Sequence, residues 1–184
     1  MKTKLALLAL TLAAPAAAQT PVNVGKFDAL SLVGGGTVTV RHGPTHRVTL
    51  VRGDLGTSSV EVKKGGSLEI RACRRSCRDY RLEVEVVTPD LDAVAITGGG
   101  SIRFTGFPAQ RSLAASVSGG GSLDTRGMAA DSVAAAIKGG GTITAAPRRS
   151  LAASINGGGT VRYTGQPTRS VSINGGGSVL RVDK

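Results

Sequence analysis

Two cysteines and a dense group of arginines lie together before the middle of the chain. Cys73 and Cys77 enclose the residues Arg-Arg-Ser. In an exported chain two cysteines favour a disulfide, and three intervening residues suit a small loop that joins two strands. The two-residue spacing of thioredoxin-like redox pairs is missing, and a zinc site would need more ligands than His42 and His46 supply. We therefore predict a structural Cys73–Cys77 disulfide and no metal site.

Arginines surround these cysteines on both sides, at Arg71, Arg74, Arg75, Arg78 and Arg81. Guanidinium groups suit the recognition of carboxylates and phosphates because each presents a planar fork of donors. A loop held by the disulfide would display several of them together, so this set is our candidate contact surface for an anion or a glycan. The alternative is a solvated basic loop with no ligand.

Residues for catalysis are sparse. The later part of the chain has Asp124 and Asp131, then no acidic residue until Asp183. Hydrolysis of glycosides by paired carboxylates needs two acids within reach of each other, and the close pair Asp90 and Asp92 reads as part of a turn. We predict a protein that is not an enzyme, with no catalytic residues and no cofactor.

The elements that must position these residues follow from a repeat of glycine triplets. Their later spacings are 21, 20, 18 and 18 residues, and a fixed period near this length marks a repeat architecture. Each triplet is followed by Ser or Thr and then by an aliphatic residue, and apolar residues occupy the second and fourth positions before most triplets. The triplets lie at 34–36, 98–100, 119–121, 139–141, 157–159 and 175–177.

Alternation of apolar with small or polar residues on both sides of a triplet predicts two β-strands that each bury one face. Such a pair buries its apolar face only when copies stack, each strand pairing in parallel with its equivalent in the next coil. We predict an all-β fold, a right-handed parallel β-helix (β-solenoid) with coils of about 18–21 residues. The triplets would form its corners, where side chains would collide with the next coil. These structural corners are Gly98, Gly99, Gly100, Gly119, Gly120, Gly121, Gly139, Gly140, Gly141, Gly157, Gly158, Gly159, Gly175, Gly176 and Gly177. A functional alternative is that their N–H groups form a row that binds anions.

The chain between the first two triplets is less regular. It contains a degenerate copy, Gly65-Gly66-Ser67-Leu68, among several alternating segments. We expect residues 22–92 to form irregular coils and hairpins that cover the first regular coil, and residues 93–184 to form the regular coils. Together, residues 19–184 would be a single domain.

The N-terminus has the features of an export signal. Lys2 and Lys4 precede a short apolar run, and small residues end at Ala18. We predict a signal peptide over residues 1–18 and a soluble protein in the periplasm or at the cell surface. The formal net charge is +11, which favours anionic partners such as polysaccharide or lipid head groups. Another envelope protein is a further possible partner, and nucleic acid is not expected.

Three segments of the chain resemble the head GIN domain family, whose members are described as auto-transporter adhesins. The segments are Ser154–Thr160, Ser172–Ser178 and the strand with its turn at Val84–Leu91. The resemblance implies an exported bacterial β-solenoid with a proposed role in adhesion and no catalytic residues to carry over.

These observations favour an exported, adhesin-like binding or structural protein of the cell envelope. One alternative is a carbohydrate-active enzyme, a polysaccharide lyase or hydrolase, on the same scaffold, which would create new chain ends in an anionic polysaccharide. Another is a self-assembling envelope protein that pairs through its last strand, Ser178–Val182, because an uncovered final coil is an open edge.

Overall fold

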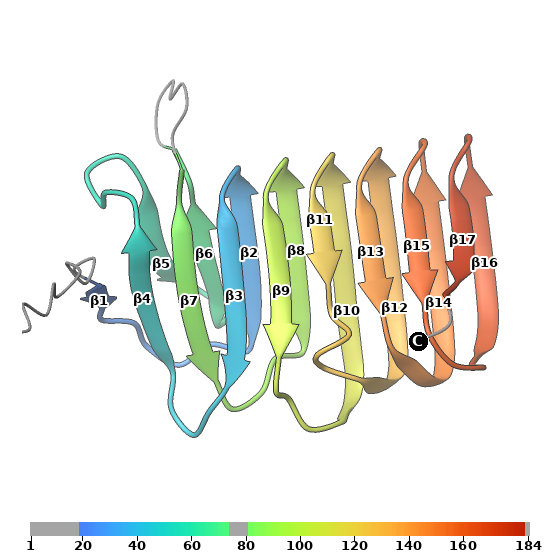
Figure 1. The fold of residues 1–184 in the computed structure, drawn as a ribbon, viewed down its shortest axis with the longest axis horizontal. Coiled ribbons are helices and arrows are strands. Elements are labelled where there is room, and N and C mark those ends of the chain that lie inside the picture. Colours follow the sequence, from blue (N-terminus) through green and yellow to red (C-terminus); the bar gives the residue numbers. More distant parts are fainter. Residues whose placement is uncertain (1–18, 74–80, 183–184) are drawn as a thin grey trace, which may run out of the picture.

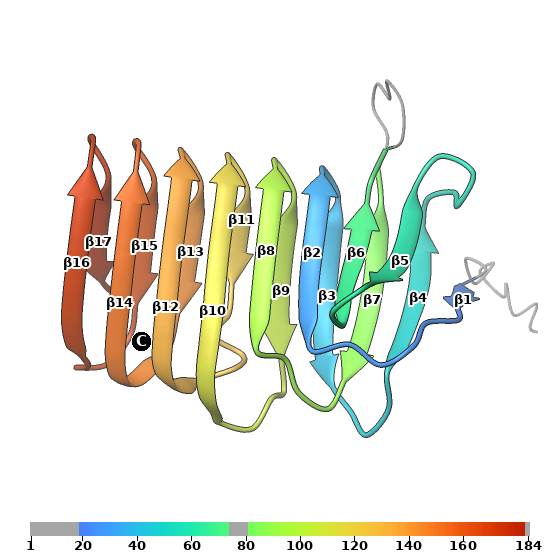
Figure 2. The same cartoon turned by 180° about the vertical axis from the view of Figure 1, so that it is seen from behind.

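The computed structural model describes residues 19–73 and 81–182, and all regular structure in these ranges is β-strand. The strands form two large sheets that face each other, with the core between them (Figure 1; Figure 2). Both sheets are mixed, because parallel pairing dominates and antiparallel strands occur at one end. The all-β expectation is therefore confirmed. Within the described ranges, no helix has the length and apolar character needed to cross a membrane.

We call the nine-stranded sheet, which lies in front in Figure 1, sheet A and the eight-stranded sheet behind it sheet B. In spatial order, sheet A contains β1 (Thr20–Val22), β4 (Arg47–Arg52), β7 (Glu83–Thr88), β3 (Thr37–His42), β9 (Ser101–Thr105), β11 (Ser122–Asp124), β13 (Thr142–Ala145), β15 (Thr160–Tyr163) and β17 (Ser178–Arg181). In spatial order, sheet B contains β16 (Thr168–Asn174), β14 (Pro147–Asn156), β12 (Ala130–Gly139), β10 (Gln110–Gly119), β8 (Ala93–Gly98), β2 (Ala29–Gly34), β6 (Ser67–Arg71) and β5 (Ser59–Lys63).

From β8 onward the chain alternates between the two sheets, and each strand pairs in parallel with its equivalent one coil later. The aliphatic residues that flank the triplets stack in register and are buried. In sheet B these are Leu32, Ile96, Val117, Ile137 and Ile155, and in sheet A they are Val38, Ile102, Leu123, Ile143 and Val161. Burial of these rows supplies the apolar core that a single coil lacks.

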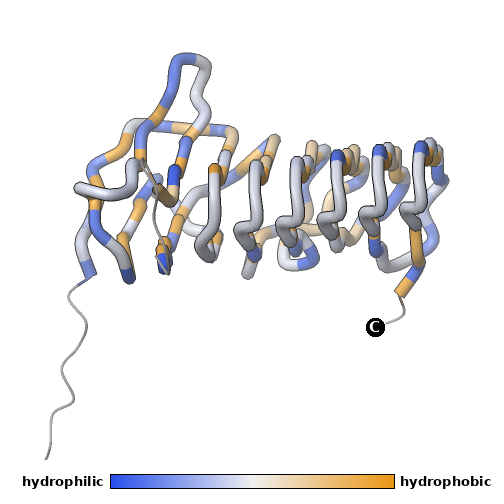
Figure 3. Tube along the Cα trace, turned by 90° about the horizontal axis from the view of Figure 1, so that it is seen from above, coloured by the Kyte–Doolittle hydropathy of each residue, from blue (hydrophilic) through white to orange (hydrophobic). Residues whose placement is uncertain are grey.

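The glycine triplets join sheet B to sheet A at one rim of the stack, and these corners repeat in line when seen from above (Figure 3). At Gly139 φ is +120°, and a Cβ built there would lie 2.8 Å from the carbonyl oxygen of Gly119 in the preceding coil. The N–H of Gly140 donates to that same oxygen at 3.0 Å. Corner N–H groups such as this one already donate hydrogen bonds to carbonyl groups of the preceding coil, which argues against the alternative of a row of free N–H groups that binds anions.

The N-terminal part folds back on itself rather than lying ahead of the regular coils. The strands β2 and β3, which flank the first triplet, pair directly with β8 and β9. On their other side they pair with β6 and β7, which come later in the sequence. The coil of the first triplet is thus regular and lies inside the stack. Our expectation that all of residues 22–92 would be an irregular cover was wrong on this point.

Antiparallel strands do finish this end of the stack, as expected for hairpins. In sheet A, β4 pairs with β7 and β1 pairs with β4, and in sheet B, β5 pairs with β6. Gly65 and Gly66 form the tight turn between β5 and β6, both with positive φ. The sequence Gly65-Gly66-Ser67-Leu68 is therefore a hairpin turn and not a degenerate corner.

Candidate functional site

A charged groove lies along sheet A at the rim opposite the glycine corners. Its volume is about 950 Å³, and it runs past the connections that lead from sheet A back to sheet B in several successive coils. The lining includes Arg103 at the centre of β9, Asp124 at the end of β11, and residues of the turns that follow β11, β13 and β15. The side chains that carry charge there are those of Arg103, Asp124, Arg126 and Arg148.

Asp124 and Arg126 form a two-pronged ion pair in this groove. The Arg126 Nε donates to Asp124 Oδ1 at 2.9 Å, and Nη2 donates to Oδ2 at 2.7 Å. The backbone N–H of Arg126 also donates to Oδ1, so the turn itself holds the carboxylate. The hydrogen bond from the Arg126 side chain is the main cause that lowers the pKa of Asp124 below its usual value of 3.8, and the charge of Arg103 adds to it. A carboxyl with a lowered pKa is ionised at neutral pH and is a poor general acid.

Two further guanidinium groups leave the groove with an excess of positive charge. Arg103 is exposed and lies beside Asp124 in the strand register. Arg148 is also exposed, and its Nη1 is 3.5 Å from Asp131, a carboxylate outside the lining. The three guanidinium groups of the lining thus face two carboxylates, Asp124 in the lining and Asp131 outside it, and one positive charge remains in excess. An anionic ligand would compensate this excess.

A row of hydroxyl groups runs across sheet A, two residues before the positions of Arg103 and Asp124 in their strands. It is made by the Ser or Thr that follows each triplet, one per coil. Its members are Thr37, Ser101, Ser122, Thr142, Thr160 and Ser178. Their side chains alternate with the buried aliphatic row, so they face away from the core. Hydroxyl groups both donate and accept hydrogen bonds, which suits contact with the hydroxyls of a sugar chain.

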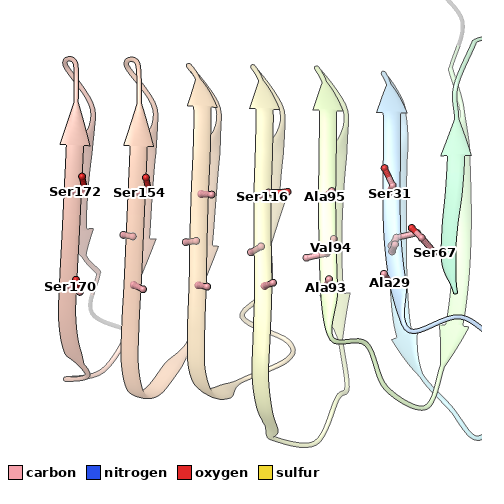
Figure 4. A pocket seen from close by; sticks show the side chains of 18 residues that line it. Ala29, Ser31, Ser67, Ala93, Val94, Ala95, Ser116, Ser154, Ser170 and Ser172 are labelled. Carbon is pink, nitrogen blue, oxygen red and sulfur yellow. The ribbon is translucent and has the colours of Figure 1, made fainter. Parts of the chain in front are cut away.

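Sheet B has a different outer face, which is covered by alanine and serine. Figure 4 shows these small side chains along successive strands, with Ala29, Ala93 and Ser170 at one level. The hollow over this face has a volume of about 690 Å³. None of the side chains that line it is charged. We therefore place the candidate site in the charged groove on sheet A.

The arginines predicted from the sequence are only partly described. Arg71 ends β6, where its Nη2 lies 3.2 Å from Glu69 Oε1, and Arg81 is exposed just before β7. Arg74, Arg75 and Arg78 lie outside the described residues, so their gathering into a contact surface stays a prediction. The same holds for the disulfide, because Cys77 lies outside the described residues.

The described residues on either side of this segment contact the first glycine corner. Ala72 donates its N–H to Val33, and the carbonyl of Leu82 accepts the N–H of Thr37. These positions adjoin Gly34 and Gly36, the ends of the first glycine corner. Ala72 and Leu82 thus lie beside the two ends of the first glycine corner.

Sequence reasoning did not single out Arg103, Arg126 or Arg148. A weak signal was present, because the second residue after each Ser or Thr of the hydroxyl row faces outward, and Arg103, Asp124 and Arg162 occupy this position. Arg126 lies in the turn after β11 and Arg148 lies near the start of β14, so the two arginines do not occupy equivalent positions of the repeat. Among the described residues, no group of three or more His, Cys, Asp or Glu side chains is placed to hold a metal ion.

Comparison with known proteins agrees with this architecture. A family model described as "Putative auto-transporter adhesin, head GIN domain" matches residues 26–114 and 108–167. A search of curated protein sequences finds no match. The crystal structure of a putative adhesin from Bacteroides fragilis NCTC 9343 aligns with a TM-score of 0.55 and 16% identity, covering 90% of this chain and 96% of that one. At this identity the likeness shows the fold alone.

Two other crystal structures align over similar lengths but with lower scores. A putative cell adhesion protein from Clostridium sporogenes ATCC 15579 has a TM-score of 0.41 and 13% identity, covering 91% of this chain and 99% of that one. A putative lipid binding protein from Parabacteroides distasonis ATCC 8503 has a TM-score of 0.38 and 17% identity, covering 90% and 96%. Neither score is high enough to support an argument from shape.

Proposed function

The chain belongs to the family described as "Putative auto-transporter adhesin, head GIN domain", and from this membership we propose an exported, adhesin-like, non-catalytic protein of the cell envelope. Its N-terminal residues 1–18, which lie outside the described residues, would act as the export signal. The mature chain would then work in the periplasm or at the cell surface.

The ligand in this proposal is an anionic polysaccharide bound along the outer face of sheet A. The observation that carries it is the groove in which Arg103, Arg126 and Arg148 outnumber the carboxylate of Asp124. Guanidinium groups pair with sugar carboxylates through two parallel hydrogen bonds. The hydroxyl row beside the groove adds hydrogen-bonding groups at the spacing of neighbouring strands, about 4.8 Å.

The scaffold in this proposal is a right-handed parallel β-helix. Parallel pairing between strands one coil apart, such as β10 with β12, supports a coiled path. The right hand is that of nearly all parallel crossovers. Such a scaffold repeats the same outward positions from coil to coil, which suits an extended polymer better than a compact ligand.

A binding measurement with matched charge variants tests the proposed ligand class. The full chain is immobilised and exposed to polygalacturonate, to neutral dextran and to vesicles of phosphatidylglycerol. We expect binding to polygalacturonate that weakens as salt rises, with no binding to dextran. The substitution Arg103→Glu should lower the affinity about tenfold, since it removes a cation and adds a repelling charge in the groove.

The matched control is Arg47→Glu, which changes the net charge equally at an exposed arginine of the same sheet, outside the groove. It should leave the affinity nearly unchanged. An equal loss in both variants would mean that only net charge matters and would count against the groove. Binding to the vesicles but not to polygalacturonate would replace polysaccharide with lipid head groups as the ligand.

A further inference from the structure

The last coil of the described chain is uncovered on its outer side. Strand β16 is the end strand of sheet B, and β17 is the end strand of sheet A (Figure 1). Each pairs with only one neighbour, β14 and β15 respectively. A parallel edge strand presents N–H and C=O groups that point away from the sheet and can pair with a further strand.

Apolar residues of the core row are exposed at this end. Ile173 has the register position of Ile155, yet 42% of its surface is exposed, against 1% for Ile155. Val171 has the position of Ala153, with 44% exposed against 4%. Together with Val179 and Arg169 they line a hollow of about 510 Å³. In every earlier regular coil, the next coil covers the corresponding positions.

In the half of this coil that lies away from the glycine corner, arginines occupy the positions of core residues. Arg169 stands at the register position of the buried Leu151, and Arg181 stands at that of the buried Tyr163. The guanidinium carbon of Arg169 lies 5.6 Å from the centre of the Tyr163 ring, which places the charge over the end of the core. Residues 165–182 contain no Asp or Glu. A covering strand would therefore meet apolar side chains near the glycine corner and a cation away from it.

A second copy of the chain is a poor match for this surface. At the opposite end of the stack β5 runs antiparallel to its neighbour β6, so a copy added head to tail would not continue the parallel pairing of sheet B. A copy that offered its own last coil would bring the Arg169 side chains of both copies into one interface. Bringing like charges together in a partly desolvated contact is costly.

We propose that the last coil is a docking edge for an extended, acidic segment of another envelope protein, which adds a strand to sheet B beside β16. Backbone hydrogen bonds to the edge would provide part of the affinity. Apolar side chains at alternate positions of the segment would cover Val171 and Ile173. A carboxylate two residues before them would pair with Arg169. This surface is separate from the groove on sheet A.

Two peptides that differ at one position test the proposal. One is a blocked peptide with the sequence of β16 in which glutamate stands at the place of Arg169, and the other keeps the arginine. Each is titrated into the isotope-labelled full chain while the amide chemical shifts are followed by NMR. We expect shifts confined to the last two coils and an affinity about tenfold higher for the glutamate peptide, the difference that one charge pair supplies.

Two variants of the protein complete the test. In Arg169→Glu the preference should reverse, so that the arginine peptide binds more tightly. In Ile173→Asp both peptides should lose binding, because a charge replaces the apolar contact. Both side chains are exposed, so neither substitution should alter the fold, and the amide spectrum of the remaining coils is the control.

The proposal is overturned if neither peptide shifts these amides, if both bind equally, or if Arg169→Glu fails to reverse the preference. It is also overturned if light scattering shows that the unaltered chain is a dimer that Ile173→Asp dissociates. In that case the occupant of the edge would be a second copy.

Discussion

The three glycines of a corner differ in how strongly their surroundings require glycine, although the sequence repeats all three in every triplet. A Cβ at Gly139 would lie 2.8 Å from the carbonyl oxygen of Gly119, and one at Gly141 would lie 2.5 Å from a methyl of Val117. At Gly140, between them, a Cβ would have no neighbour within 4 Å. The requirement for glycine thus falls on the first and third positions of the triplet.

This difference predicts the outcome of single alanine substitutions in one corner. Gly139→Ala should lower the free energy of unfolding by about 2 kcal/mol, because alanine is strained at a φ of +120° and its methyl meets the backbone of the preceding coil. Gly140→Ala should change it by less than about 1 kcal/mol. Urea unfolding followed by circular dichroism measures both. Equal losses would contradict this difference between the first and the middle glycine.

The ion pair of Asp124 has consequences that depend on pH. Its pKa is lowered in the folded chain, so the carboxylate contributes stability above its unfolded pKa, and this contribution is lost as the pH falls through the lower folded pKa. Asp124→Asn should therefore destabilise the protein by about 1 kcal/mol or less at neutral pH, since the pair is partly exposed. The two proteins should converge in stability once the pH is well below 3.8, the usual pKa of the group.

The same substitution should strengthen binding to polygalacturonate, because it removes the carboxylate from the groove while Arg103, Arg126 and Arg148 remain. Thermal unfolding across pH and the binding measurement above check the two effects separately. A loss of both stability and binding would show that the ion pair mainly positions Arg126.

At the scale of the element, each coil is stabilised by the coil that follows it. Strands β14 and β16 are equivalent in register, but the core residues of β14 are covered and those of β16 are not. The stability that an apolar side chain contributes should therefore depend on its coil rather than on its type.

Substitution of the same residue type in adjacent coils measures this dependence. Ile155→Ala should cost about 3 kcal/mol, because it leaves a cavity in a filled core. Ile173→Ala should cost less than about 1 kcal/mol, because Ile173 is already 42% exposed. Similar losses at both positions, measured by urea unfolding, would mean that the last coil is covered in solution.

At the scale of the whole molecule, the stack has two unlike ends. Antiparallel strands close one end, and the other leaves apolar and cationic side chains of β16 and β17 exposed. The charged groove and the hydroxyl row run between these ends on sheet A, and the uncharged alanine and serine face lies on sheet B. The groove on sheet A and the exposed edge of the last coil are thus two separate surfaces of the molecule.

The regular coils were predictable from the sequence because each coil needs the same glycine triplet and the same flanking apolar residues to stack on its neighbour. The pattern around the triplets at 98–100 and 119–121 gives the pairing of Ile96 with Val117 directly. The pairing of β6 with β2 and of β7 with β3 was not predictable from the sequence. The starts of the first two triplets are 64 residues apart, and no repeated pattern between them indicates which strands pair. The groove was missed for a related reason, because Arg103, Arg126 and Arg148 occupy different positions of the repeat and come together only in space.

The middle glycine of each corner has free space for a side chain, and these positions recur at a regular spacing along the stack. Gly99, Gly120, Gly140, Gly158 and Gly176 recur once per coil with no neighbour near the place of a side chain. Side chains introduced there would project in single file at the strand spacing of about 4.8 Å. Chromophores, metal ligands or charged groups could be arranged along this line at chosen intervals, without any change to the residues that hold the coils together.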